Sequence, residues 1–524
     1  DEVIIADELA EQFKEKCKIE KLEKIKSLED ISNIVCNHPF HNSGYEFDVN
    51  LYHADFVTLE QGTGFVHIAP GHGPDDYELG KANGVEVPET VDKDGIYFNH
   101  VPLFHGKKIF NDDGSDAEAN VAVIIELRNH NALSGKGSLR HSYPHSWRSK
   151  APVIFRNTPQ WFISMETNDL RKKALDAIEK VNWYPAQGKN RILSMIENRP
   201  DWVVSRQRAW GVPLSIFYHK ASGEPLVDTK LNEKIIKMYE EQGCDVWFEK
   251  TKAELLGDEY NPDEYEKVDD ILDVWFDSGC THAFVLDGKE DQIWPASIYL
   301  EGTDQHRGWF HSSLLESCGT RGIAPYEAVL THGFVLHEDG NKMSKSSSNI
   351  VPPAEIIEKS GADILRLWVA SSDYSDDLKI GPEIIKSNAD SYRRLRNSLR
   401  FILGNLDNFE DSEKIKFSEL PELDQYILGR LTVLEEEVLK NYQIFEYQKV
   451  FSAIFNFCTN ELSAFYFDIR KDSLYCDSKS SLVRRATRTV LDILFSHLLT
   501  LLAPILCFTA EEAWQSRLGK DTSI

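Results

Sequence analysis

The chain has 524 residues, of which 41% are hydrophobic and 11% aromatic. This length exceeds one ordinary core, and the composition is that of a packed globular protein, not a disordered one. The formal charge of −27 excludes a uniformly basic nucleic-acid-binding surface, so a nucleic-acid partner would need local basic patches. The eight cysteines form no CxxC pair, so the sequence predicts reduced thiols, with no disulfide framework and no zinc site.

Three segments with different hydrophobic patterns follow one another along the chain. Together they predict an α/β protein with a helical C-terminal part. Residues 1–140 contain short β-branched and aromatic runs between Gly, Pro and Asp-Gly turns, which predicts a compact mixed α/β unit. Residues 141–380 alternate apolar runs with helical segments, which indicates βαβ units and a parallel sheet. Residues 381–524 carry long amphipathic stretches and predict a helix bundle. The longest apolar run, 494–508, is too short for a membrane span and predicts a buried helix, so no membrane contact is expected.

The segment 341–349, NKMSKSSSN, places Lys342 and Lys345 three residues apart among serines. Two mobile lysines on a small-residue background can converge on phosphate oxygens. The alternative is a solvated surface turn, and the loop by itself does not decide between the two.

Polar residues follow an apolar strand in YLEGTDQHRGWF (299–310). The strand is expected to end at Glu301-Gly302 and a helix to begin near Thr303 or Asp304. Open parallel sheets bind ligands at the carboxyl ends of their strands, beside helix N-termini, which favours a ligand site here. The alternative is ordinary helix capping with a satisfied His306. Nearby, DVWFDSG (273–279) by itself predicts a buried aromatic strand followed by a turn.

The N-terminal segment 62–80, GTGFVHIAPGHGPDDYELG, gathers two histidines and two aspartates, namely His67, His72, Asp75 and Asp76. Their spacing matches no helical H-x-x-x-H pair, so a metal is not predicted. A polar pocket lined by loop backbone is the better functional interpretation, and the alternative is a Gly/Pro turn whose aspartates cap their own backbone.

Arginines recur on two predicted helices. Arg393, Arg396 and Arg400 share one helical face, and a second group comprises Arg484, Arg485 and Arg488. Such patches can track nucleic-acid phosphates, and the alternative is a solvated helix face.

These segments in this order resemble class I aminoacyl-tRNA synthetases of the isoleucyl type, in their bacterial or organellar form. Residues 342–346 are identical to the family signature KMSKS, and TPQWFISM (158–165) and RPDWVVSRQRAWGVPL (199–214) resemble isoleucyl blocks, as do the three segments quoted above. The resemblance covers essentially the whole chain. It implies a partial editing domain at 1–140, the second half of a Rossmann catalytic domain at 141–380, and a partial helical anticodon-binding domain at 381–524.

The resemblance also implies chemistry and site residues. The reaction is ATP-dependent activation of isoleucine, with ATP as its Mg²⁺ complex, followed by transfer to tRNA(Ile) and hydrolytic editing of valyl-tRNA(Ile). The implied catalytic residues are Lys345 and Lys342, which bind ATP together with Ser344 and Ser346. The implied aminoacyl-adenylate site comprises Glu301, Gly302, Asp304, Gln305, Trp309 and Trp275. Asp76 and His67 belong to editing, and Arg393, Arg396 and Arg400 are candidates for tRNA contact. A monomer in the cytoplasm or an organellar matrix is expected.

The sequence departs from the family pattern in three places. The His-Ile-Gly-His signature of the first Rossmann half is absent, the threonine-rich segment of the editing pocket is absent, and so is the C-terminal cysteine-rich zinc module. The resemblance leaves zinc open for the intact protein and assigns no ligand for it in this chain. We interpret the chain as part of a longer enzyme, inactive in aminoacylation by itself. The alternative is a noncatalytic tRNA-binding or editing-only derivative.

Overall fold

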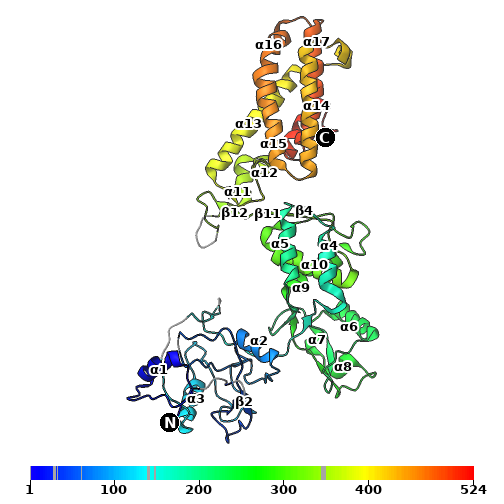
Figure 1. The fold of residues 1–524 in the computed structure, drawn as a ribbon. Helices are drawn as coiled ribbons and strands as arrows, with labels where there is room; N and C mark the ends of the chain where they lie inside the picture. Colours follow the sequence, from blue (N-terminus) through cyan, green and yellow to red (C-terminus); the bar gives the residue numbers. More distant parts are fainter. Residues whose placement is uncertain are drawn as a thin grey trace. The chain divides into compact units, whose positions relative to one another are not determined.

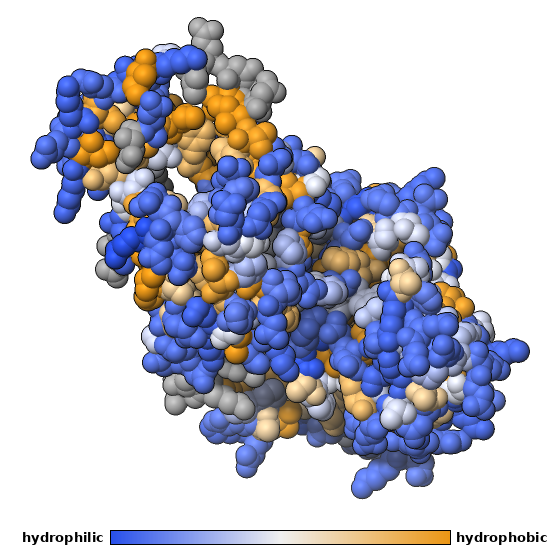
Figure 2. All heavy atoms as spheres, turned by 90° about the horizontal axis from the view of Figure 1, so that it is seen from below, coloured by the Kyte–Doolittle hydropathy of each residue, from blue (hydrophilic) through white to orange (hydrophobic). Residues whose placement is uncertain are grey.

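The computed structural model describes residues 2–27, 31, 34–60, 62–137, 142–146, 149–343 and 350–524. They fall into two units, Asp1–Gln160 and Trp161–Ile524, so the first break lies 20 residues beyond the one expected at 140. The second unit contains both the predicted sheet and the predicted bundle. Hydrophilic side chains cover most of the face shown in Figure 2, as the high charge of the chain requires.

The first unit has little regular structure. Its helices are η1 (Asp7–Leu9), α1 (Ala10–Cys17), α2 (Pro74–Ala82) and α3 (Glu118–Asn129), and its strands β1 (Val35–Asn37) and β2 (Asp48–Asn50) pair antiparallel. Turns connect these elements, in keeping with the many Gly and Asp-Gly positions (Figure 1). The fully buried core that they share is small and centres on Phe40, Val101 and Phe104.

The second unit contains a parallel sheet, as predicted. Its strand order is β10 (Tyr299–Gly302), β11 (Ala328–His332), β4 (Asn182–Tyr184). The helices α4 (Leu170–Ile178), α5 (Gln187–Glu197) and α10 (Trp309–Arg321) share one core with these strands, and α4 packs directly on α10. In α10 the buried residues run from Phe310 to Cys318 without interruption, so this helix is covered on several sides.

Shorter elements surround this sheet. The antiparallel pairs are β3 (Phe162–Ile163) with β5 (Trp202–Val203), β6 (Ser205–Arg206) with β9 (Ile271–Leu272), and β7 (Phe217–His219) with β8 (Tyr265–Lys267). The helices are η2 (Thr167–Asp169), α6 (Thr229–Gln242), α7 (Val246–Glu249), α8 (Lys252–Leu256), α9 (Val274–Gly279), η3 (His282–Leu286) and η4 (Thr303–Arg307). A parallel pair, β12 (Val335–His337) with β13 (Leu378–Ile380), and two helices, α11 (Pro353–Ser360) and α12 (Ala362–Ser371), lead into the C-terminal part.

The C-terminal part is the predicted helix bundle (Figure 1). It comprises α13 (Pro382–Asn405), α14 (Glu422–Gln443), α15 (Tyr447–Asn456), η7 (Phe457–Tyr466), α16 (Phe467–Cys476), α17 (Leu482–Leu502) and α18 (Cys507–Leu518), with the short turns η5 (Asp411–Glu413) and η6 (Phe417–Glu419). One apolar stripe of each long helix joins a single large core. Among the described residues, every helix is too short or too polar to span a bilayer.

Candidate functional site

The carboxyl end of β10 gathers the polar residues that the sequence placed there. β10 pairs in parallel with β11, so Gly302 lies opposite His332. The chain then turns into η4, where Arg191 from α5 donates a hydrogen bond to the Thr303 hydroxyl at 2.8 Å. A Cβ on Gly302 would lie 2.6 Å from Asp304 Oδ1, so the Asp304 carboxylate folds directly over the glycine backbone. This is the strand-end position at which open parallel sheets bind ligands.

One turn further on, Gly308 lies against the Trp275 ring and directly precedes Trp309. A Cβ on Gly308 would lie 2.6 Å from Gln305 Oε1 and 2.7 Å from the Trp275 ring, so the glycine permits these two side chains to approach each other. Gln305 accepts the Trp309 backbone N–H at 3.0 Å. The Trp309 ring stacks on Tyr299 with centroids 4.1 Å apart, and its indole N–H donates to the Ser278 carbonyl at 3.0 Å. The structure therefore brings Gln305, Trp275 and Trp309 together beside β10.

The segment that carries Trp275 is a helix, so the predicted strand at 273–279 is wrong. Asp273 caps α9 by accepting the Trp275 N–H at 3.2 Å. The buried Asp273 carboxylate also accepts the Trp202 indole N–H at 3.2 Å and a guanidinium N–H of Arg206 at 2.9 Å. It thereby joins the start of α9 to β5 and β6. This role was not predicted from the sequence, although an Asp directly before an apolar run is an N-cap signal.

Glu316, inside α10, is a second residue whose role was not predicted from the sequence. Only 8% of Glu316 is exposed, and the Cys280 thiol is a polar neighbour of its carboxylate. A Cβ on Gly279 would collide with this carboxylate, so Glu316 fills the space beneath the end of α9. Burial raises the pKa of Glu316 to about 8, and burial together with Glu316 raises the pKa of the Cys280 thiol to about 12. The glutamate is therefore held in its neutral form at pH 7.

The lysine loop follows β12 through a tight turn. Within it, Gly340 N–H donates to the His337 carbonyl at 2.8 Å, and His337 N–H donates to the Asn341 carbonyl at 3.0 Å. Lys342 then lies with its ammonium 5.1 Å from the centre of the Phe334 ring. Ser344, Lys345 and Ser346 lie outside the described residues.

In the first unit, Asp76 lies in the first turn of α2 and its carboxylate accepts the Ala69 N–H at 2.9 Å. His67 is exposed, and burial together with His67 lowers the pKa of His38. A cavity of about 220 Å³ opens beside the start of α2, lined by Pro70, Gly71, Gly73, Pro74, Tyr77, Phe155, Arg156 and Asn157. No group of three or more His, Cys, Asp or Glu side chains arranged to hold a metal occurs in the part of the chain that the structure describes.

Comparison with known families settles the class of protein. The family model of tRNA synthetases class I (I, L, M and V) matches residues 11–381, which is more than half of the chain. The chain belongs to the class I tRNA synthetases. A second family model, the anticodon-binding domain of tRNA ligase, matches residues 424–524 of this synthetase chain.

Curated relatives of this synthetase are named isoleucine–tRNA ligase. The protein from Pelagibacter ubique is 52% identical over 97% of this chain and 56% of its own length. The protein from Gluconobacter oxydans is 51% identical over 94% of this chain and 52% of its own length. The chain thus spans about half the length of these relatives.

Solved structures agree on the fold. Mycobacterium tuberculosis methionyl-tRNA synthetase in complex with methionyl-adenylate superposes with a TM-score of 0.51 at 18% identity. The match covers 71% of this chain and 65% of that one. The likeness supports the class I synthetase fold of this chain.

In the bundle of the synthetase, the three arginines on α13 differ in their contacts. Arg396 forms two hydrogen bonds with the Glu512 carboxylate, at 2.7 and 3.0 Å, and one with the Tyr392 hydroxyl. Arg393 pairs with Asp390 at 2.8 Å on the exposed surface. Arg400 is exposed and has no ion pair among the described residues. The guanidinium of Arg396 is therefore already engaged within the bundle, whereas Arg400 is available.

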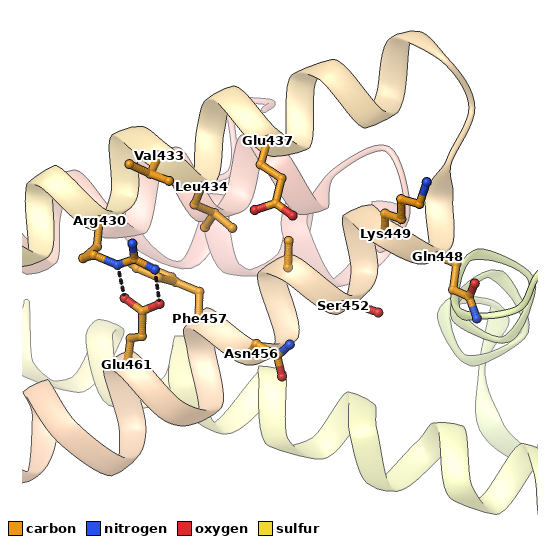
Figure 3. A pocket seen from close by; sticks show the side chains of 11 residues that line it. Arg430, Val433, Leu434, Glu437, Gln448, Lys449, Ser452, Asn456, Phe457 and Glu461 are labelled. Atoms are coloured by element: carbon orange, nitrogen blue, oxygen red, sulfur yellow. Dashed lines mark hydrogen bonds and ion pairs between the residues drawn. The ribbon is translucent and has the colours of Figure 1, made fainter.

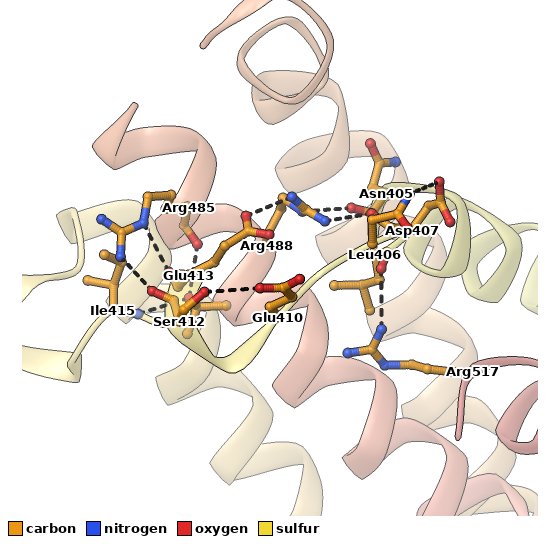
Figure 4. A network of polar contacts seen from close by, with 12 residues as sticks. Asn405, Leu406, Asp407, Glu410, Ser412, Glu413, Ile415, Arg485, Arg488 and Arg517 are labelled. Atoms are coloured by element: carbon orange, nitrogen blue, oxygen red, sulfur yellow. Dashed lines mark hydrogen bonds and ion pairs between the residues drawn. The ribbon is translucent and has the colours of Figure 1, made fainter. Parts of the chain in front are cut away.

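The second arginine group holds a loop of the chain itself (Figure 4). Arg488 is 5% exposed, donates to the carbonyls of Asn405 and Asp407, and pairs with the Glu413 carboxylate at 2.7 Å. Arg485 donates to the carbonyls of Ser412 and Glu413. These guanidinium groups satisfy carbonyls at and beyond the end of α13. Arg485 and Arg488 therefore have a structural role within the chain.

A groove of about 340 Å³ lies between α14 and the α15–η7 segment (Figure 3). Its cations are already paired, because Arg430 donates twice to the Glu461 carboxylate at 2.8 Å and Lys449 lies 3.5 Å from the Glu446 carboxylate. Exposed polar side chains of α15 face the groove, namely Gln448, Ser452 and Asn456. The groove therefore offers amide and hydroxyl groups, with its positive charge neutralised.

Proposed function

We propose that the whole protein to which this chain belongs is an isoleucine–tRNA ligase, which activates isoleucine with ATP and transfers it to tRNA(Ile). The observation that carries the proposal is the 52% identity over 97% of the chain with a relative that bears this name. The gathering of Gln305, Trp275 and Trp309 at the carboxyl end of β10 supports it, because ligands bind at that edge of an open parallel sheet.

Each group of residues has a distinct part in activation. Attack of the isoleucine carboxylate on the α-phosphate of ATP releases pyrophosphate, so negative charge redistributes over the phosphates in the transition state. Lys342 and Lys345, with Ser344 and Ser346, would stabilise that charge as a cationic loop that closes over the nucleotide. ATP enters as its Mg²⁺ complex, which makes the ion part of the substrate.

The aminoacyl-adenylate would lie against β10 and η4. The backbone of Gly302 allows close approach, and Glu301, Asp304 and Gln305 offer carboxylate and amide groups for the hydroxyl and ammonium groups of the adenylate. Trp275, 42% exposed and packed over Gly308, and Trp309 form the apolar wall for the isoleucine side chain. The exposed indole face of Trp275 is available for this contact.

Isoleucine-dependent exchange of pyrophosphate into ATP tests the activation step. The complete gene product is expected to catalyse this exchange, and Lys345→Ala is expected to lower kcat by at least tenfold. The 524-residue chain by itself is expected to show none. Exchange by the isolated chain that disappears in Lys345→Ala would overturn the view that its ATP site is incomplete. Absence of exchange in the complete product would favour the noncatalytic tRNA-binding or editing-only derivative.

We propose that the first unit edits valyl-tRNA(Ile). Valine lacks one methylene of isoleucine, and a hydrophobic pocket discriminates this by only about 1–3 kcal/mol, a magnitude established on isoleucyl-type enzymes themselves. A second, hydrolytic site that admits the smaller product supplies the remaining discrimination. The Asp76 carboxylate would pair with the free ammonium of the valyl group, and His67 would line the pocket.

Editing is tested with Asp76→Ala in the complete enzyme. Accumulation of valyl-tRNA(Ile) is expected to rise while the rate of isoleucylation stays within twofold of wild type. The neighbouring, exposed Asp75→Ala serves as the matched control. Misacylated product that stays at the wild-type level in Asp76→Ala contradicts the assignment.

We propose further that tRNA contacts the bundle and that the enzyme acts as a monomer in the cytoplasm or an organellar matrix. Arg400 and Arg393, exposed on α13, are the candidates for phosphate contact, and Arg396 would add to it only by leaving Glu512. Arg400→Ala is expected to weaken tRNA binding and to reduce its salt dependence. Light scattering coupled to size exclusion measures the oligomeric state.

A further inference from the structure

Phe445, in the turn between α14 and α15, has a backbone conformation that is rare for its side chain. Its φ is +60°, in the left-handed region that Gly and Asn tolerate and that a bulky residue seldom adopts. Such a conformation is strained and persists only where surrounding contacts hold it. The contacts that hold Phe445 therefore indicate what the conformation is for.

Phe445 contacts the helix bundle, where its ring meets Tyr447 of α15 with centroids 6.3 Å apart, and also residues outside the bundle. The Phe445 ring meets Tyr184, the last residue of β4, edge-on with centroids 4.8 Å apart. The Tyr374 hydroxyl, from the segment between α12 and β13, donates a hydrogen bond to the Phe445 carbonyl. Tyr374 and Tyr447 also contact each other, with ring centroids 5.9 Å apart. The turn thus joins the bundle to the parallel sheet and to the segment before β13.

The Tyr374 segment in turn supports the strand that leads to the lysine loop. Gly333 N–H donates to the Tyr374 carbonyl at 2.9 Å, and a Cβ on Gly333 would collide with the Asp376 carbonyl. Phe334 N–H donates to the Asp377 carboxylate at 2.8 Å, and its ring carries the Lys342 ammonium at 5.1 Å. These contacts are a backbone hydrogen bond, a hydrogen bond to a carboxylate and a cation–ring contact, and together they connect Tyr374 to Lys342.

We propose that Phe445 is a positioning residue for the ATP site: it holds the Tyr374 segment, and through Gly333 and Phe334 it fixes the root of the lysine loop at Lys342. The proposal rests on the proposed function for its consequence in catalysis and on the contacts alone for its structural part. It assigns the α14–α15 turn of the anticodon-binding region a role in the activation step, which takes place without tRNA.

The physical mechanism follows from the strain. Without the ring, the Tyr184 contact no longer opposes relaxation of residue 445 to a negative φ, and the carbonyl turns away from Tyr374. The Tyr374 hydroxyl then loses its acceptor, and the segment that backs Gly333 and Phe334 loosens. The lysines themselves are unchanged, but the backbone that leads to Lys342 samples more positions. ATP therefore binds less tightly.

Hydrogen exchange of the 524-residue chain tests the structural part. Phe445→Ala is expected to accelerate exchange of the Gly333 and Phe334 amides by at least tenfold. Phe445→Gly should have a smaller effect, because glycine adopts a positive φ without strain and keeps the carbonyl in place. Ile444→Ala, at an exposed position in the same turn, is the matched control and should change nothing at these amides.

Tyr374→Phe keeps the test decisive if Phe445→Ala fails to fold. It removes only the hydroxyl that donates to Phe445 and leaves the ring in place, so the same two amides should exchange faster. Unchanged exchange at Gly333 and Phe334 in a folded Phe445→Ala and in Tyr374→Phe would overturn the proposal.

Pyrophosphate exchange in the complete enzyme tests the catalytic part. Phe445→Ala is expected to raise the KM for ATP by about tenfold while the KM for isoleucine stays within twofold, a split that general loss of structure would not produce. Equal changes in both KM values contradict a positioning role. A wild-type enzyme that shows no pyrophosphate exchange would refute the proposed function. The structural part of the proposal would then be tested by hydrogen exchange alone.

Discussion

The first unit and the helix bundle differ in how much apolar surface they bury. The bundle places long amphipathic helices around one large core, in which Leu491, Leu494 and Leu498 have no exposed surface. The first unit is turn-rich, and the buried cluster among its described residues is small and centres on Phe40, Val101 and Phe104. Apolar burial must offset the conformational entropy of every ordered residue, so a unit with few buried side chains opens first. Regions that must admit a ligand are commonly drawn from such low-stability parts.

The ion pairs of the two regions also differ in burial. The bundle buries an ionic cluster, since Asp424 has no exposed surface and receives the Tyr466 hydroxyl at 2.6 Å and the Arg470 guanidinium. In the first unit the ion pairs lie at the surface, as in Lys108 with Asp112. A buried pair ties its neighbours to one geometry, whereas an exposed pair contributes little.

The largest expected effect tests this buried cluster. Asp424→Ala leaves Arg470 buried without its partner and is expected to lower the free energy of unfolding by about 3–5 kcal/mol. Urea denaturation followed by circular dichroism at 222 nm measures it. Asp468→Ala, which removes an exposed partner of Lys471 on α16, is the control and should cost less than about 1 kcal/mol. Equal losses in both variants would contradict the role given to burial.

A core substitution in each region tests whether the two open separately. Phe104→Ala is expected to destabilise the first unit by about 3 kcal/mol and to move only the earlier unfolding transition. Leu498→Ala should move only the later one, because it removes packing from the bundle. Limited proteolysis along a urea gradient, with fragments identified by mass, resolves the two transitions. A single transition that both substitutions shift equally would show that the regions unfold together.

The effect of the buried Glu316 carboxyl on the pH dependence of stability is tested with Glu316→Gln. Burial raises the pKa of Glu316 from 4.5 in the unfolded chain to about 8, so the folded state holds a proton that the unfolded state releases. The stabilisation is therefore complete below about pH 4.5 and falls as the pH rises to 8, by at most about 1.4 kcal/mol per pH unit. Glu316→Gln should remove this slope, and the exposed Glu437→Gln should preserve it. A slope that persists in Glu316→Gln would assign it to another group.

The smallest expected effect concerns the exposed ion pair on α13. The side chains of Arg396 and Glu512 are 38% and 59% exposed, so water screens their attraction. Arg396→Ala is expected to lower the free energy of unfolding by less than about 1 kcal/mol. A double-mutant cycle with Glu512→Ala isolates the pair energy. A coupling above about 2 kcal/mol would place this pair with the buried cluster at Asp424 instead.

The sequence predicted the regular parts of this molecule well. Helical periodicity after residue 380 and alternating apolar runs before it indicated the bundle and the parallel sheet, and both were confirmed. The prediction of a strand at 273–279 was wrong, because the cap that Asp273 forms on α9 outweighs the β-propensity of Trp275 and Phe276. Arg485 and Arg488 satisfy carbonyls at and beyond the end of α13, a long-range contact that local sequence patterns do not show.

By itself, the sequence determined the class of the elements, their order and the motifs that carry chemistry, because periodicity and local residue types are properties of short segments. Only the tertiary structure decided which of these residues meet. Gln305 and Trp275 meet at Gly308, burial under Gly279 raises the pKa of Glu316, and a strained Phe445 reaches Tyr184 and Tyr374. Burial and long-range contact depend on how distant segments pack, and no window of sequence contains that information.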